Sequence, residues 1–247
     1  MCAALLLLAA RTFGPQQLPE VHDADDPLTD ASSIVPGLVV RLAYATPANA
    51  AGRVLYTSGA RCLLRRSVAD RLALAARSLR SQGFRLVAYD CWRDHAAQEA
   101  LWKAHPHPGS VADPRRGSLH ERGVAVDVGL ADLSGAPVEM PTAFDAFGPD
   151  AAAAAAIADG PAKAHRDALQ AAMHAAGFRV NPAEWWHFSR LWGWRWPVAR
   201  RPPAHRDQRT GGEAEMPSNS SGSPPLPHSQ ARGCASETAS RQACSSE

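Results

Sequence analysis

The stretch Gly123-Val124-Ala125-Val126-Asp127-Val128-Gly129-Leu130 decides the fold. Large apolar and small residues alternate along it, which predicts a strand whose Val and Leu side chains bury one face. The other face carries glycine, alanine and one carboxylate, and it leaves space for another group to approach Asp127. Because desolvating a carboxylate alone is costly, Asp127 needs a partner, either in a structural salt bridge or in a functional site.

Helical and strand patterns alternate on both sides of this stretch. Apolar spacing predicts helices over 67–82, 94–104 and 161–176, a further helix in the alanine run 151–156, a strand over 84–89 and a loop over 105–117. Helices that alternate with antiparallel hairpins predict the α+β class. We therefore expect a single domain with a mostly antiparallel central sheet flanked by helices.

Composition divides the chain into three parts. Residues 200–247 are rich in Ser, Pro and Gly and hold few large apolar side chains, which predicts a disordered tail. Residues 34–199 form the predicted domain, and residues 1–33 form a leader that contains the apolar run Ala3–Ala10. This run favours either an export signal or a loose or docked terminal helix, so cytoplasmic and periplasmic or exported locations both stay open.

Charge and composition exclude several classes of partner. The 247 residues hold 26 basic and 24 acidic side chains without a basic block, which argues against nucleic acid. No apolar run reaches 18 residues, so we expect no transmembrane span, and no protein partner can be inferred. The cysteines lack the tight spacing of a disulfide framework or a zinc site and predict buried or unreactive thiols; they are Cys2, Cys62, Cys91, Cys234 and Cys244.

His120 lies seven residues before Asp127 and would face the opposite way in an unbroken strand. A bend over 121–123 would bring the two side chains together, and Gly123 suits such a bend. Histidine and aspartate are common zinc ligands, but this spacing is a weak signal by itself.

The segment Asn181-Pro182-Ala183-Glu184-Trp185-Trp186-His187-Phe188 predicts the start of a helix. Asn181 is a natural N-cap, and Glu184 at the third helical position is then either only its capping-box partner or a functional group. Glu184 and His187, three residues apart on one turn, would project the same way. A metal-binding histidine beside a glutamate is the geometry of a metal-activated water and its general base.

Arg93 follows the strand predicted over 84–89 and stands at the start of the next helix. Two roles fit this position. The guanidinium could form a structural ion pair with Asp90 or Asp94, or it could stabilise an oxyanion in an active site.

These segments together resemble the zinc D-Ala-D-Ala dipeptidases, the VanX-type branch of the D-Ala metallopeptidases that are related to hedgehog domains. The resemblance covers residues 39–192. The family's S-x-H-x-x-G-x-A-x-D is complete over 118–127, and its E-x-W-H-F is complete over 184–188. Residues 41–49 resemble its R-Y-A-T-x-x-N stretch, and residues 140–145 resemble its M-G-T-x-F-D. The fold implied is the same α+β fold.

The resemblance implies one Zn²⁺ per chain, held by His120, Asp127 and His187. It implies that Glu184 takes a proton from water and passes it to the leaving amine, and that Arg93 stabilises the oxyanion. The activity implied is hydrolysis of the dipeptide D-Ala-D-Ala to two D-Ala, in cell-wall precursor or peptidoglycan metabolism.

The resemblance also implies that Ser118 and Asp145 bind the free ammonium end of this small dipeptide. The sequence departs from the family pattern at three positions: Asp94 replaces a proline, Ala50 replaces an aromatic residue, and Pro141 replaces a glycine. Pro141 stiffens the loop that aims Asp145, so the restriction to dipeptides is less secure than the hydrolysis. The alternatives are a zinc DD-carboxypeptidase or endopeptidase acting on peptidoglycan stem peptides, and a non-catalytic zinc-stabilised binding module.

Overall fold

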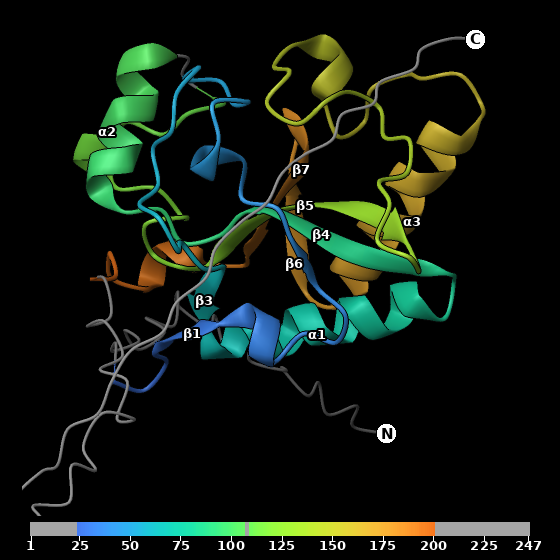
Figure 1. Ribbon diagram of the computed structural model, residues 1–247, viewed down its shortest axis with the longest axis horizontal. Helices are drawn as coiled ribbons and strands as arrows, with labels where there is room; N and C mark the ends of the chain where they lie inside the picture. The colour runs from blue at the N-terminus through green and yellow to red at the C-terminus, as the bar shows by residue number, and fades with distance from the viewer. Residues whose placement is uncertain (1–23, 107–108, 201–247) are drawn as a thin grey trace, which may run out of the picture. The chain divides into compact units, whose positions relative to one another are not determined.

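The computed structural model describes residues 24–106 and 109–200 (Figure 1). The predictions for the apolar run Ala3–Ala10, for the tail beyond residue 200 and for Cys2, Cys234 and Cys244 lie outside these residues. None of the helices within the described ranges combines the length with the apolar character that crossing a bilayer requires.

A five-stranded sheet forms the centre of the domain. Its strands lie in the order β2-β4-β5-β7-β6, with β2 and β4 parallel and every other pair of neighbours antiparallel. The strands are β2 (Val39–Val40), β4 (Phe84–Asp90), β5 (Ala125–Asp132), β6 (Phe178–Asn181) and β7 (Glu184–Arg190). The predicted α+β fold with a mostly antiparallel sheet is confirmed, and the deciding stretch supplies its middle strand.

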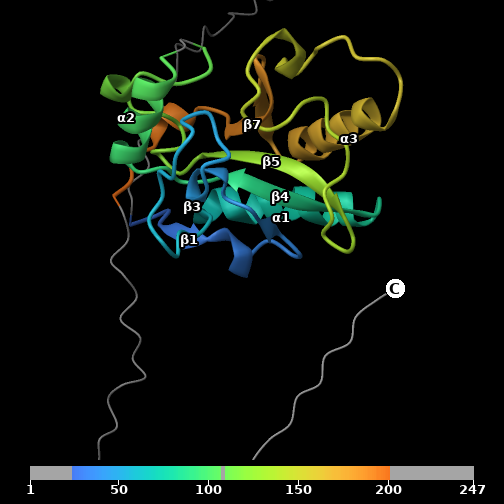
Figure 2. The same ribbon diagram turned by 45° about the horizontal axis from the view of Figure 1, so that its top comes forward.

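Three α-helices accompany the sheet: α1 (Arg66–Arg80), α2 (His95–Ala104) and α3 (Pro161–Ala175). The apolar stripes of α1 and α3 pack together with the Val and Leu face of β5 in one core. Figures 1 and 2 show α2 on the other side of the sheet from α1. Short 3-10 helices lie in the connections, at Ala31–Ser33, Ala43–Ala45, Pro114–Arg116, Pro149–Ala151 and Gly193–Arg195. The core therefore occupies one face of β5 and leaves the face of Asp127 for a site.

A second, two-stranded sheet pairs β1 (Leu28–Asp30) with β3 (Leu63–Arg65). Ala31, directly after β1, is fully buried. Packed residues are thus present within the last ten residues of the predicted leader, before the boundary at residue 34.

Two local predictions are wrong. Of the alanine run over 151–156, only Ala151 belongs to a helix, the short turn Pro149–Ala151. The segment from Asn181 is a hairpin between β6 and β7, not the start of a helix. An Asn-Pro pair suits a tight turn as well as a helix start, and the following aromatic residues favour a strand once neighbouring strands are present.

Cys62 and Cys91 form a disulfide, and both are buried. The prediction of unreactive thiols is therefore wrong for this pair. Their separation of 29 positions conceals the pairing in the sequence. In the fold the two cysteines lie side by side. Trp92 follows Cys91 and Leu63 follows Cys62, and the backbone N–H of Trp92 donates a hydrogen bond to the carbonyl of Leu63.

Candidate metal centre

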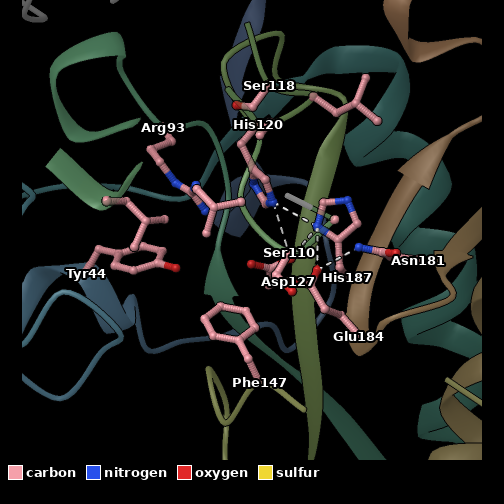
Figure 3. Close-up of a pocket in the computed structure, with 15 residues that line it drawn as sticks. Tyr44, Arg93, Ser110, Ser118, His120, Asp127, Phe147, Asn181, Glu184 and His187 are labelled. Carbon is pink, nitrogen blue, oxygen red and sulfur yellow. Dashed lines mark hydrogen bonds and ion pairs between the residues drawn. The ribbon is translucent and has the colours of Figure 1, made fainter. Parts of the chain in front are cut away.

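His120, Asp127 and His187 point toward one another on the face of β5 that the core leaves free (Figure 3). One ligand atom from each lies within 4.8 Å of the other two. Asp127 Oδ1 is 3.3 Å from His120 Nε2 and 2.9 Å from His187 Nδ1, and the two ring nitrogens are 3.1 Å apart. The structure thus brings together the three residues that the sequence analysis named as metal ligands.

Strand register and one tight turn produce this convergence. Asp127 on β5 stands directly opposite His187 on β7, so both side chains emerge on the same face. His120 reaches them through the predicted bend, where Gly123 has a φ of +71°. A Cβ at Gly123 would lie 2.5 Å from Leu28 Cδ2, so both the conformation and the space require glycine.

The face of β5 that carries Asp127 is only partly accessible. The ring of Tyr89 lies beside Gly129, where an added Cβ would be 2.7 Å from it. The expected space is therefore filled at Gly129, and only the part of the face near Asp127 borders a cavity.

The electrostatics of the cluster favour a cation. Burial alone would raise the pKa of Asp127, but the neighbouring rings of His120 and His187 outweigh burial and lower that pKa. Burial opposes a charged His120, yet the carboxylates of Asp127 and Asp90 raise its pKa. The carboxylates thus stabilise positive charge at the point where the side chains meet, and a divalent ion would supply such a charge in place of protons.

His120 is held from behind. Its Nδ1 lies 2.7 Å from the carbonyl oxygen of Cys91 and 3.3 Å from Asp90 Oδ2. Since a carbonyl only accepts, Nδ1 carries the proton, and the lone pair of Nε2 faces Asp127 and His187. A metal-binding histidine has this arrangement in proteins.

Glu184 begins β7 at the hairpin turn and lies beside the cluster, with Oε2 3.9 Å from His187 Nδ1. Asn181 donates a hydrogen bond of 2.9 Å to the same oxygen. Burial raises the pKa of Glu184 to about 7, although His187 opposes this rise. Its carboxyl group can therefore exchange a proton near neutral pH.

Arg93 is buried between β4 and α2, and it forms the predicted ion pair with Asp90. It donates hydrogen bonds to Asp90 Oδ2 from Nε and Nη2 and to Gln98 Oε1 from Nη1. Its guanidinium also lies over the ring of Tyr44, 4.8 Å from the ring centroid. A guanidinium has five N–H groups, so two remain without a partner among the residues that the structure describes. The ion pair with Asp90 is present, and Arg93 still has donors for an oxyanion.

A cavity of about 310 Å³ opens over the cluster. It borders six of the seven predicted site residues, namely Arg93, Ser118, His120, Asp127, Glu184 and His187. The rest of its lining combines apolar and aromatic side chains, such as Tyr44 and Phe147, with the polar Ser110 and Asn181, and Figure 3 shows these four around the cluster. A chamber of this size suits a small ligand.

Asp145 is the predicted site residue that does not line this cavity. Its carboxylate accepts hydrogen bonds from the hydroxyl of Tyr44, at 3.2 Å, and from the backbone N–H of Ala50, at 2.9 Å. Burial raises its pKa to about 6. The backbone at Asp145 is left-handed, with a φ of 62°, a conformation that aspartate tolerates better than most residues. Because Ala50 contributes its backbone, this contact does not depend on an aromatic side chain there.

Comparison with known proteins agrees with this geometry. The M15 peptidase family, described as D-ala-D-ala dipeptidase, matches residues 25–194. The chain belongs to this family. A curated relative, the D-alanyl-D-alanine dipeptidase of Escherichia coli (strain K12), is 37% identical over 161 residues, which cover 65% of this chain and 83% of that protein.

Family membership confirms the resemblance drawn from the motifs and makes the chain a peptidase, a hydrolase. Within this M15 peptidase, three residues near the site escaped the sequence analysis as contributors: Tyr44, Asn181 and Cys91. Asn181 carried a signal, since it was singled out beside Glu184, but for a helix cap. The carbonyl of Cys91 carried none, because any residue type supplies a backbone carbonyl.

Proposed function

We propose that this peptidase hydrolyses D-Ala-D-Ala to two molecules of D-Ala with one Zn²⁺ held by His120, Asp127 and His187. The convergence of these side chains beside Glu184 carries the proposal. The name of the Escherichia coli relative supports the dipeptide as substrate. The setting we propose is cell-wall precursor or peptidoglycan metabolism.

The donor set fits zinc. Two imidazole nitrogens and one carboxylate oxygen are ligands that zinc accepts, and three protein ligands are typical of catalytic rather than structural zinc sites. When bound, the ion supplies Lewis acidity and lowers the pKa of water.

Glu184 would act as the general base. Its carboxylate accepts a proton from the attacking water and then donates it to the amine of the departing D-Ala. A pKa of about 7 suits both transfers, since the group can hold or release the proton near neutral pH. Asn181 fixes the carboxylate by its hydrogen bond to Oε2.

Arg93 would donate its two remaining N–H groups to the oxygen of the tetrahedral intermediate. Asp90 and Gln98 hold the guanidinium in place without using all of its donors. Ser118 and Asp145 would bind the substrate's ammonium group. A carboxylate accepts about four hydrogen bonds, so the contacts of Asp145 with Tyr44 and Ala50 leave it further capacity.

One observation favours a second candidate, a zinc DD-carboxypeptidase or endopeptidase acting on peptidoglycan stem peptides. Asp145 already accepts hydrogen bonds from Tyr44 and Ala50, and it does not line the cavity. An N-acylated substrate has no ammonium group to pair with the carboxylate of Asp145. The two existing hydrogen bonds would lower the cost of leaving this buried charge without such a partner, so the enzyme could accept an acylated substrate.

Activity on two substrates tests the proposal. The purified full chain is given D-Ala-D-Ala or N-acetyl-D-Ala-D-Ala, and released D-Ala is measured before chelation, after chelation and after zinc is restored. We expect kcat/KM to favour the free dipeptide by at least about 100-fold, since the analogue loses a charge-assisted contact. We also expect chelation to abolish activity and zinc to restore it. Preference for the acetylated substrate would establish the second candidate, and activity that survives complete metal removal would refute the zinc mechanism.

A further inference from the structure

The Cys62–Cys91 disulfide lies directly behind the metal centre. We propose that this disulfide positions His120 for metal binding, so that the affinity of the site for zinc depends on whether the two sulfurs are bonded. The proposal rests on the zinc site of the proposed function. Cys62 and Cys91 are positioning residues, because neither side chain is among the metal ligands or the cavity lining.

The first step is the contact between Cys91 and His120. The carbonyl oxygen of Cys91 accepts the Nδ1 proton of His120 at 2.7 Å. This bond sets the tilt of the ring and keeps the lone pair on Nε2, the atom that faces Asp127 and His187. Loss of such an outer partner of a metal-binding histidine commonly lowers metal affinity by about 10- to 100-fold.

The backbone of Cys91 lies outside the regular strand pairing. Cys91 follows the end of β4, where the pairing with β5 already shifts register between Ala88 and Asp90. Its N–H donates to Asp90 Oδ1 at 2.9 Å and its carbonyl accepts from His120, so both of these backbone groups bond to side chains. The only strand contact of this peptide unit is on its other edge, among the residues that the structure describes: the N–H of Trp92, which shares the planar unit with the Cys91 carbonyl, donates to Leu63 O on β3 at 2.9 Å.

The disulfide adds a covalent connection between Cys91 and a residue that the backbone holds in place. Cys62 directly precedes β3, and its own carbonyl accepts the N–H of Ala31 at 2.8 Å. The sulfur–sulfur bond thus ties the irregular residue Cys91 to a well-anchored one. Both cysteines are about 1% exposed, so the tie lies within the core. Without it, the hydrogen bond from Trp92 N to Leu63 O is the nearest remaining backbone connection between these two segments.

The chemistry of the switch is reversible. A phosphine reductant takes an oxygen atom from water and becomes its oxide, while the disulfide gains two electrons and two protons and gives two thiols. Oxidised glutathione reverses this, since it is reduced to two thiols as the protein disulfide forms again. Disulfides persist in oxidising compartments and not in the reducing cytosol, so the compartment would set the fraction of molecules with the tighter zinc site.

The test uses the full chain with Cys2, Cys234 and Cys244 replaced by serine, so that Cys62 and Cys91 are the remaining cysteines. Intact mass before and after reduction shows whether the bond is present. The phosphine is removed without air, and the Kd for zinc is measured by competition with a chromophoric chelator in the oxidised, reduced and reoxidised protein. The double variant Cys62→Ala/Cys91→Ala controls for zinc bound by the freed thiols.

We expect reduction to weaken zinc binding by about tenfold or more, reoxidation to restore it, and the alanine pair to match the reduced protein. D-Ala-D-Ala hydrolysis at limiting zinc should fall with reduction and recover at excess zinc. Equal zinc affinity in all forms would overturn this proposal and leave the proposed function intact. Absence of the disulfide in the oxidised protein would also overturn it. Unfolding of the whole domain on reduction would overturn it as well, because the disulfide would then contribute to overall stability and not to the position of His120. Failure of the oxidised protein to bind zinc would overturn both proposals.

Discussion

Glu184 offers the sharpest test at the scale of a single residue. Glutamine in its place keeps the size of the side chain and an oxygen for the hydrogen bond from Asn181, but it cannot take a proton. We expect Glu184→Gln to retain zinc and to lower kcat for D-Ala-D-Ala by about 10²- to 10⁴-fold, the usual contribution of a general base. Zinc content and steady-state rates are the measurements.

The matched control for this substitution is Glu99→Gln, because Glu99 is largely exposed on α2 and outside the cavity. It should leave both zinc content and kcat unchanged. A Glu184→Gln enzyme within tenfold of the wild-type rate would remove Glu184 from the mechanism.

Asp145 predicts a dependence of stability on pH. Burial raises its pKa from 3.8 to about 6, so the folded chain binds this proton more tightly than the unfolded chain does. Its contribution is therefore fully present below about pH 4 and is lost as pH rises to about 6. The loss approaches about 3 kcal/mol, since one pKa unit corresponds to about 1.4 kcal/mol.

Asp145→Asn has no such proton to lose. We expect the free energy of unfolding of the metal-free wild type to fall relative to that of Asp145→Asn between pH 4 and pH 6, and then to change in parallel. Urea unfolding of both proteins at each pH measures the difference, and titrations shared by the two proteins cancel. Parallel curves over the whole range would mean that Asp145 is not buried as the structure places it.

At the scale of the element, apolar periodicity was sufficient to predict a helix or strand that packs one face against the core. The stripe of α1 and the alternation of β5 each encode burial against the core, and both elements lie where the sequence predicts them. The β6–β7 hairpin was beyond local reasoning, because Asn181-Pro182 fits a helix start and a turn equally well. The pairing of β7 with both β5 and β6 decides between them, and that pairing is not a local property.

At the scale of the whole molecule, the convergence of His120, Asp127 and His187 was predictable because two short motifs and one glycine turn carry these residues. The groups that hold these three side chains in place were not predictable, since they depend on contacts between distant segments. Cys91 bonds to Cys62, 29 positions away in the sequence, and contacts His120 through a backbone carbonyl, which every residue type has. Asp145 was singled out from its sequence motif, but its hydrogen bonds with Tyr44 and Ala50 could not be predicted from the sequence.

Asp26 also makes long-range contacts, and its loss should lower the stability of the whole domain. One oxygen of this buried carboxylate accepts the backbone N–H of Ser67 at 2.8 Å, so it caps the start of α1 from 41 residues away. The other accepts the Ser67 hydroxyl and, at 2.9 Å, Nε1 of Trp196 near the end of the described chain. A single side chain thus links the first strand region, a core helix and the last turn.

We expect Asp26→Ala to lower the free energy of unfolding by about 2–5 kcal/mol. The substitution leaves the buried Nε1 of Trp196 without an acceptor, at about 1–3 kcal/mol, and it also removes the acceptor of the half-buried Ser67 N–H. Asp70→Ala is the control on the same helix, since its ion pair with Arg66 is exposed and should contribute less than about 1 kcal/mol. Urea unfolding measures both, and zinc affinity should stay unchanged in each folded variant, because neither residue reaches the metal cluster. A loss in Asp26→Ala no larger than that in Asp70→Ala would show that the ends of the domain are held by other contacts.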